Sequence, residues 1–140
     1  MTNQRISDGV AIWIDHRIAI MVYFPNDRFQ NGKNVWIEEG LNGQKQDHSI
    51  QHRNGHRQEA LKHYYDNMIN QLKHLVHVND ILILGPGQAK YELFHRIDHY
   101  KSLKGKIKNI QNAPCMSEQD LKAFANQYFT EWFKKNKGSH

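Results

Sequence analysis

"ILILGPGQAK" (residues 81–90) begins with four apolar residues, passes through Gly-Pro-Gly and ends in polar residues that favour a helix. A continuous apolar run of this length is typical of a strand that is covered on both faces. The spacing of Ala89, Leu93, Ile97 and Tyr100 predicts that a helix follows the turn. A buried strand that leads through a tight turn into a helix indicates an α/β fold.

Three strands are expected upstream of this stretch. Residues 10–15, "VAIWID", have the pattern of a buried strand, and residues 17–24, "RIAIMVYF", are apolar on both of their alternating sides. Asp15-His16-Arg17 would be the short connection, in which the Asp15 side chain fixes the turn by hydrogen bonds to the backbone. With a third strand around "NVWIEE", these strands are expected to pair in antiparallel order.

Two longer helices complete the predicted framework. The first has one apolar stripe, formed by Leu61, Tyr65, Met68, Leu72 and Leu75. The second is expected to begin after Ser117, a capping residue followed three positions later by Asp120. Its inward-facing residues are predicted to be Leu121, Phe124, Ala125, Tyr128 and Trp132. With a strand expected at residues 106–112, the prediction is an α/β protein: a mixed sheet of three antiparallel strands, then alternating helix and strand, with the helices packed on the sheet.

The size and composition of the chain are those of one domain. Its 140 residues are 39% hydrophobic, which is enough for one core. We expect a single domain over residues 1–137 and a flexible end at residues 138–140. The polar stretch "GLNGQKQDHSIQHRNGHR", residues 40–57, is expected to be a long exposed loop within this domain.

Charge and cysteine content indicate the surroundings of the protein. The 19 Lys and Arg exceed the 14 Asp and Glu, for a formal charge of +5, and the excess favours an anionic partner such as RNA. One cysteine, Cys115, allows no intrachain disulfide and no cysteine-based zinc cluster. No apolar run approaches the roughly 20 residues that cross a bilayer. The chain is therefore expected to be soluble and cytoplasmic, with no membrane partner.

The turn Gly85-Pro86-Gly87 lies where phosphate-binding loops are found, between a strand and a helix. However, Pro86 lacks a backbone N–H, and the residues after Gly87 do not provide the Gly-Lys-Ser/Thr of a P-loop. The dinucleotide fingerprint would need a third glycine where Lys90 stands. We therefore expect a structural corner, in which both glycines adopt backbone angles closed to other residues and Pro86 stiffens the turn. No cofactor is predicted.

The sequence also resembles a known family over nearly its whole length. "VAIWIDHRIAIMVY", "EALKHYYDNMINQL", "DILILGPGQAKYELFHRI" and "APCMSEQDLKAFANQYF" are similar to small bacterial proteins related to the central domain of archaeal and eukaryotic peptide-chain release factor and of Pelota. The most specific pieces are residues 13–17 and residues 84–87 followed by Lys90. The resemblance implies the ribonuclease H-like α/β fold of translational machinery components and a translation-related role. In the release factor, a catalytic Gly-Gly-Gln loop precedes the first long helix, which draws attention to residues 40–57.

The polar loop offers weak signals for catalysis and for a metal. Gln44, in Asn-Gly-Gln, is the one candidate for a Gly-Gln catalytic residue, but Gly-Gln pairs of this kind also arise by chance. His48, His52 and His56 recur every four residues and would line one face if the segment were helical. Asn54-Gly55 argues against a helix there, so a solvated loop is favoured over a metal site. Asp15, the one strand carboxylate of a possible metal-dependent nuclease, has no evident partners.

Contact with RNA is the preferred function of the loop. The residues predicted to contact RNA are Lys45, His52, Arg53, His56, Arg57 and Lys90. The favoured hypothesis is a non-catalytic, translation-associated protein that contacts the ribosome, tRNA or other structured RNA through this basic, His-rich loop. The alternatives are a peptidyl-tRNA or related ester hydrolase that uses the loop, and a protein-interaction module with no RNA partner. The sequence leaves the oligomeric state open.

Overall fold

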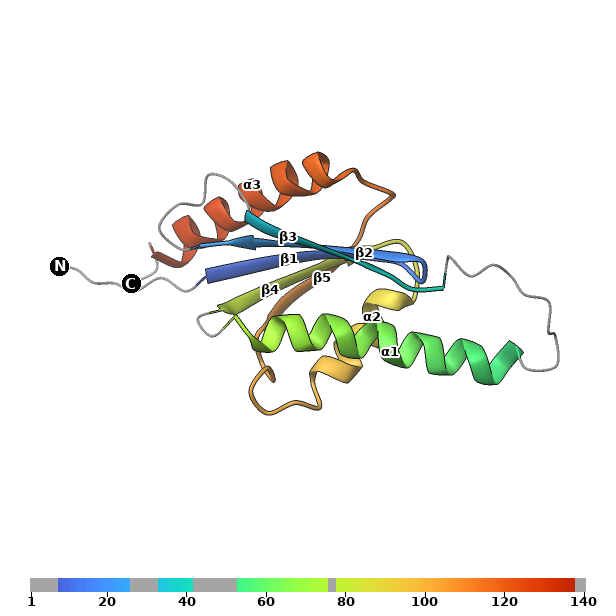
Figure 1. Cartoon of the computed structure of the whole chain (residues 1–140). Helices are drawn as coiled ribbons and strands as arrows, with labels where there is room; N and C mark the ends of the chain where they lie inside the picture. The colour runs from blue at the N-terminus through green and yellow to red at the C-terminus, as the bar shows by residue number, and fades with distance from the viewer. Residues whose placement is uncertain (1–7, 26–32, 42–52, 76–77, 138–140) are drawn as a thin grey trace.

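The computed structural model describes residues 8–25, 33–41, 53–75 and 78–137. In these residues the predicted order of strands and helices is confirmed (Figure 1). The elements are β1 (Asp8–Ile14), β2 (Ile18–Phe24), β3 (Lys33–Glu39), α1 (Arg53–Lys73), β4 (Val78–Gly85), α2 (Ala89–Ile97), β5 (Ile107–Asn112) and α3 (Glu118–Lys137).

The strands form one mixed sheet in the order β3-β2-β1-β4-β5. β1 pairs with β2, and β2 with β3, in antiparallel register, whereas β1–β4 and β4–β5 are parallel. Parallel neighbours need a crossover, and α2 provides it between β4 and β5. The predicted α/β class, with three antiparallel strands followed by alternating helix and strand, is therefore confirmed.

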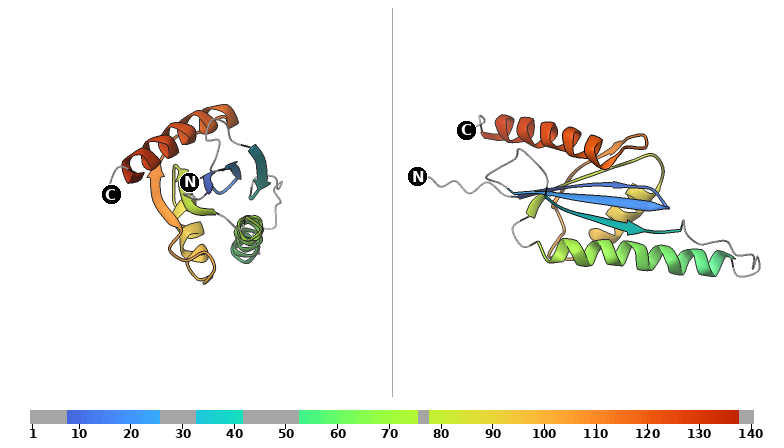
Figure 2. Two further views of the ribbon diagram at one scale, coloured as in Figure 1. Left: turned by 90° about the vertical axis from the view of Figure 1, so that its left-hand side faces the viewer. Right: turned by 45° about the horizontal axis from the view of Figure 1, so that its top comes forward.

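The centre of the sheet is covered on both faces. All seven residues of β1 are buried, and successive residues belong to different apolar clusters. Ile12 and Ile14 face α1 and α2, whereas Ala11 and Trp13 face α3. Figure 2 shows the three layers, with α3 on one side of the sheet and α1 and α2 on the other. The prediction that "ILIL" in β4 is covered on both faces is confirmed by the same division.

Helix α1 begins earlier than predicted. Its apolar stripe is confirmed, since Tyr65, Met68 and Leu72 are buried in the core on this side of the sheet. However, the helix starts at Arg53 and includes Asn54-Gly55, so the predicted loop does not extend to residue 57. One glycine inside a helix costs about 1 kcal/mol relative to alanine. The helix-favouring residues after it, together with the packing of the stripe, outweigh that cost.

Helix α3 has the predicted start but a different buried face. The N–H of Asp120 donates to the Ser117 Oγ at 3.0 Å, which confirms the cap. Leu121 and Ala125 are buried as expected, but Phe124 is 37% exposed, and Phe129 is 1% exposed in its place. Phe124 lies about 100° around the helix from the centre of the buried stripe, at its edge rather than within it. The side chain of Trp132 lies outside the described residues.

Within the described ranges, no helix has the length and apolar character that crossing a membrane requires.

Candidate functional site

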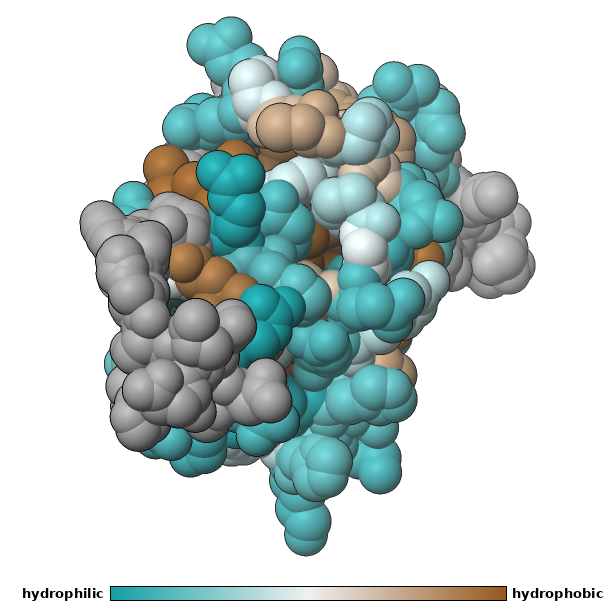
Figure 3. Space-filling view, turned by 90° about the vertical axis from the view of Figure 1, so that its right-hand side faces the viewer, coloured by the Kyte–Doolittle hydropathy of each residue, from teal (hydrophilic) through white to brown (hydrophobic). Residues whose placement is uncertain are grey.

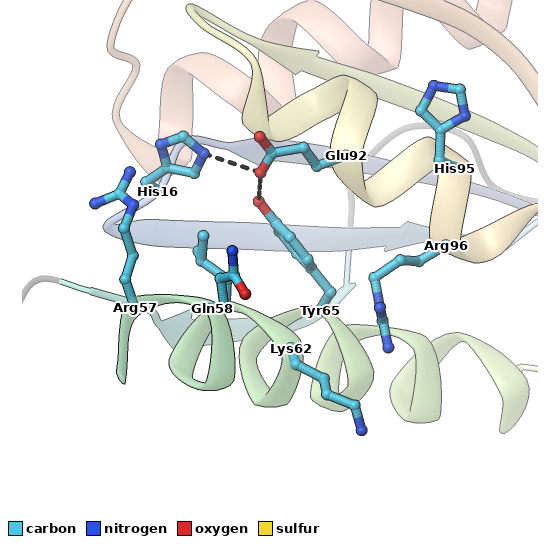
Figure 4. A pocket seen from close by; sticks show the side chains of 9 residues that line it. His16, Arg57, Gln58, Lys62, Tyr65, Glu92, His95 and Arg96 are labelled. Atoms are coloured by element: carbon cyan, nitrogen blue, oxygen red, sulfur yellow. Dashed lines mark hydrogen bonds and ion pairs between the residues drawn. The ribbon is translucent and has the colours of Figure 1, made fainter. Parts of the chain in front are cut away.

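An open groove of about 590 Å³ lies between α1 and α2, beside the β1–β2 hairpin (Figure 4). Most of its lining residues have a polar or charged end group. The lining residues are His16, Arg57, Gln58, Leu61, Lys62, Tyr65, Glu92, His95 and Arg96. Figure 3 views the molecule from the side on which α1 begins, where hydrophilic side chains predominate. The groove thus brings together residues far apart in the sequence, on the face of the sheet opposite α3.

The β1–β2 turn that carries His16 is held from two sides. The Asp15 Oδ1 accepts hydrogen bonds from the N–H groups of Arg17 (2.8 Å) and Ile18 (2.9 Å), so the predicted role of Asp15 is confirmed. After β3, the Leu41 N–H donates to the His16 carbonyl at 2.8 Å. His16 is therefore presented by a fixed turn.

Glu92 connects the three elements that form the groove. The Tyr65 hydroxyl, from α1, donates to the Glu92 Oε1 at 2.6 Å. His16 Nε2, from the hairpin, lies 3.0 Å from the same oxygen. Because a carboxylate can only accept, His16 Nε2 carries the proton of this bond. The α2 carboxylate is thus bound to α1 and to the hairpin at once (Figure 4).

The ionisation of this cluster follows from its contacts. Burial raises the pKa of Tyr65 far above its ordinary value, and the hydrogen bond to Glu92 raises it further. Burial alone would also raise the pKa of Glu92, but hydrogen bonds from Tyr65 and His16 and the charge of Arg57 outweigh it and leave that pKa below its ordinary value. At neutral pH the centre of the groove therefore holds a carboxylate and a neutral phenol.

The cations of the groove differ in their partners. Arg96 forms an ion pair with Asp66 at 2.8 Å, and Lys62 lies 3.9 Å from the same carboxylate. Arg57 is exposed and has no ion-pair partner in the described part of the chain. In Figure 4 its side chain extends from α1 to the side of His16. Of the two predicted RNA-contacting residues whose side chains the structure describes, Arg57 and Lys90, Arg57 lines the groove and forms no ion pair with a described residue.

The prediction that Lys90 contacts phosphate must be corrected. Its side chain is only 1% exposed. Its ammonium group donates to the Gly87 carbonyl at 2.7 Å and lies 4.8 Å from the centre of the Tyr91 ring. A side chain in this position closes the turn after β4 and is not available to the phosphate of a large ligand.

The Gly-Pro-Gly corner is structural, as predicted, but its two glycines differ. A Cβ on Gly85 would lie 2.1 Å from the carbonyl oxygen of Ile14, because β1 and β4 approach closely there. Nothing lies within 4 Å of the corresponding position on Gly87, and this glycine does not have a positive φ. The prediction of a special backbone conformation at Gly87 was therefore wrong.

Several predicted residues cannot be placed. Gln44, Lys45, His48 and His52 lie outside the described residues. Arg53 and His56 belong to the first two turns of α1, but their side chains lie outside the described part. Among the described residues, no group of three or more His, Cys, Asp or Glu could hold a metal ion.

The Tyr65–Glu92 pair was not among the contacts predicted from the sequence. Tyr65 was assigned to the apolar stripe of α1, and it is indeed buried. A buried tyrosine needs a partner for its hydroxyl, which was the one available signal. The partner itself could not be inferred, because Glu92 is 27 residues away on another helix.

Comparisons with known proteins identify the fold. No family model matches the sequence, and no curated protein is similar to it in sequence. Among solved structures, the chain is similar to Pelota from Archaeoglobus fulgidus (TM-score 0.57, 11% identity, 84% of this chain) and from Thermoplasma acidophilum (0.51, 17%, 82%). It is also similar to an archaeal translation termination factor (0.56, 13%, 94%). It spans 30%, 30% and 42% of these proteins, respectively. The chain therefore shares the fold of part of Pelota and of that termination factor, in agreement with the resemblance to their central domain.

Proposed function

We propose that the protein is a translation-associated, non-catalytic factor that binds ribosomal RNA or tRNA in the cytoplasm. The binding surface would be the layer formed by α1 and α2, with its centre at the groove. The likeness to Pelota and to a translation termination factor supports the choice of translation among the processes that use RNA.

The observation that carries this proposal is the distribution of charge along the fold. Residues 53–108, which include α1 and α2, contain ten Lys and Arg and five Asp and Glu. The rest of the chain contains nine of each, so the whole excess of +5 comes from this segment. α3, on the opposite face of the sheet, has four Lys against three Asp and Glu, so its net charge is only +1. A one-sided excess of this kind attracts a polyanion to one face of a protein.

Arg57 is the expected main contact in the groove. It is exposed, and it has no carboxylate partner among the described residues, so binding a phosphate would break no ion pair. Lys62, at 58% side-chain exposure, adds a second cation one to two turns further along α1. The predicted contacts of Lys45, His52, Arg53 and His56 remain part of the proposal, because these residues belong to the start of α1 and the segment that precedes it.

The experiment is co-sedimentation with purified ribosomes over a series of salt concentrations. We expect the logarithm of the binding constant to fall linearly with the logarithm of the salt concentration. Arg57→Gln and Lys62→Gln should each weaken binding and reduce that slope by about 1, as expected for one lost phosphate contact.

Lys122→Gln is the matched control, because it removes one partly exposed helical cation from the opposite face. It should leave the slope unchanged. Equal effects of the three substitutions would contradict the assignment of the surface. Absence of binding at low salt would overturn the proposal and would favour a protein-interaction module instead.

A further inference from the structure

Glu92 is out of place in a groove that only binds phosphate. Among the described residues that line the groove, which include Arg57, Lys62 and Arg96, it is the one carboxylate. A carboxylate there repels phosphate and weakens the attraction of its cationic neighbours. A ligand that contains both an anionic group and an N–H donor would use both kinds of charge.

The structural contacts of Glu92 occupy only one of its two oxygens. Tyr65 and His16 both bind to Oε1, and together they fix the orientation of the carboxylate. No group in the described ranges forms a hydrogen bond with Oε2. The Glu92 side chain is 44% exposed, and Figure 4 shows its second oxygen turned away from Tyr65. A partly exposed carboxylate of fixed orientation, with one oxygen that no described group occupies, thus lines the groove.

We propose that the groove holds one unpaired nucleotide, whose base donates an amino N–H to the Glu92 Oε2 while Arg57 contacts its phosphate. This inference rests on the proposed RNA binding and specifies what the groove binds. The groove volume of about 590 Å³ lies within the range of sites for small ligands. Sequence-specific recognition of RNA usually reads unpaired bases by hydrogen bonds to their edges.

The bases that the groove should prefer follow from the chemistry of the Glu92 Oε2, which can only accept a hydrogen bond. Cytosine, adenine and guanine carry exocyclic amino groups, and a Glu that accepts from the cytosine amino group is a known pairing. Uracil has a carbonyl oxygen where cytosine has this amino group, and its one Watson–Crick donor, N3–H, lies between two carbonyl oxygens that a carboxylate repels. The groove should therefore disfavour uracil.

The experiment measures binding of short oligocytidylate, oligoadenylate and oligouridylate, of equal length, to the full chain at low salt. We expect oligocytidylate and oligoadenylate to bind roughly tenfold more tightly than oligouridylate, the effect of one hydrogen bond to a charged group. Equal binding of the three probes, or no binding of any of them, would overturn the inference. If ribosomes still bind in that case, the proposed function stands without it.

Glu92→Gln gives a sharper test, because Tyr65 and His16 require an acceptor at the Oε1 position. The amide oxygen should take that position, which places the amide NH₂ where Oε2 was. A donor there favours the uracil carbonyl, so the preference for cytosine should be lost or reversed. If the substitution instead strengthens binding of all probes alike, Glu92 acts only through its charge and the inference fails.

Glu118→Gln is the matched control. Glu118 is also in the first turn of a helix, and its side chain is 43% exposed, almost the same as that of Glu92. This variant loses the same charge, and its preference should remain that of the unmodified chain. Tyr65→Phe, which keeps the charge but removes one of the two bonds that orient Glu92, should weaken the preference. Thermal unfolding of each variant checks that the fold is retained.

Discussion

Gly85 shows how a single hydrogen atom in place of a side chain lets two central strands meet. A Cβ at this position would overlap the carbonyl oxygen of Ile14 at 2.1 Å. Backbone cannot move aside as a flexible side chain does, so β1 or β4 would have to shift. Gly87, two residues later, has open space around the same position.

We expect different effects on stability when Gly85 and Gly87 are each replaced by alanine. Gly85→Ala should lower the free energy of unfolding by more than about 2 kcal/mol, because it forces strained backbone at the centre of the sheet. Gly87→Ala should leave it unchanged or raise it by less than about 1 kcal/mol. Urea denaturation measures both. Similar losses in the two variants would mean that the corner as a whole, and not the contact with Ile14, requires glycine.

Because Tyr64 and Tyr65 are buried, we expect the protein to lose stability at high pH. Burial is the main cause that raises the pKa of Tyr64 and of Tyr65 above the ordinary value of 10.0. Above about pH 10 the unfolded chain releases these protons and the folded chain retains them, so the free energy of unfolding falls as the pH rises. In the variant Tyr64→Phe/Tyr65→Phe this fall should be smaller. If denaturation at several alkaline pH values gives the same slope for both proteins, the two phenols ionise equally in both states.

At the scale of elements, the start of α3 was predicted correctly, whereas its buried face was predicted only in part. Its start was predicted from Ser117, because a cap is a local signal. Its buried face was predicted in part, since Leu121 and Ala125 were identified, but Phe124 was included and Phe129 was not. Both phenylalanines fit an apolar stripe of a helix, and only the curvature and partners of the sheet determine which one is covered.

The two phenylalanines of α3 provide a stability test. Phe129 is 1% exposed, and its ring centroid lies 5.5 Å from that of Phe24. Phe129→Ala should lower the free energy of unfolding by roughly 3–5 kcal/mol, the usual cost of truncating a core phenylalanine. Phe124→Ala should cost less than about 1 kcal/mol, since Phe124 is partly exposed. A larger loss for Phe124 in urea denaturation would contradict the observed orientation of α3.

The sheet was predicted more completely than the groove. The strands β1, β2 and β4 were recognised because alternation and continuous apolar runs are visible within a few residues. The start of α1 was misjudged because a local penalty at Gly55 is outweighed by packing elsewhere in the helix. The bonds from Glu92 to Tyr65 and to His16 span 27 and 76 residues, so no local pattern could indicate them.

At the scale of the whole molecule, the central claim is that one layer binds RNA. The lysines provide reporters on that layer, since those in α1 and in the segment after α2 are accessible and lie opposite α3. These are Lys62, Lys73, Lys101 and Lys104. Lys122 in α3 reports on the other face, and the buried Lys90 should remain unreactive throughout and serves as an internal reference.

The most direct test is lysine acetylation, read by mass spectrometry, of the protein free and bound to ribosomes. We predict that binding protects Lys62, with weaker protection along the same layer, and leaves Lys122 as reactive as in the free protein. Protection of Lys122 together with unchanged reactivity of Lys62 would contradict the claim that the α1–α2 layer contacts RNA.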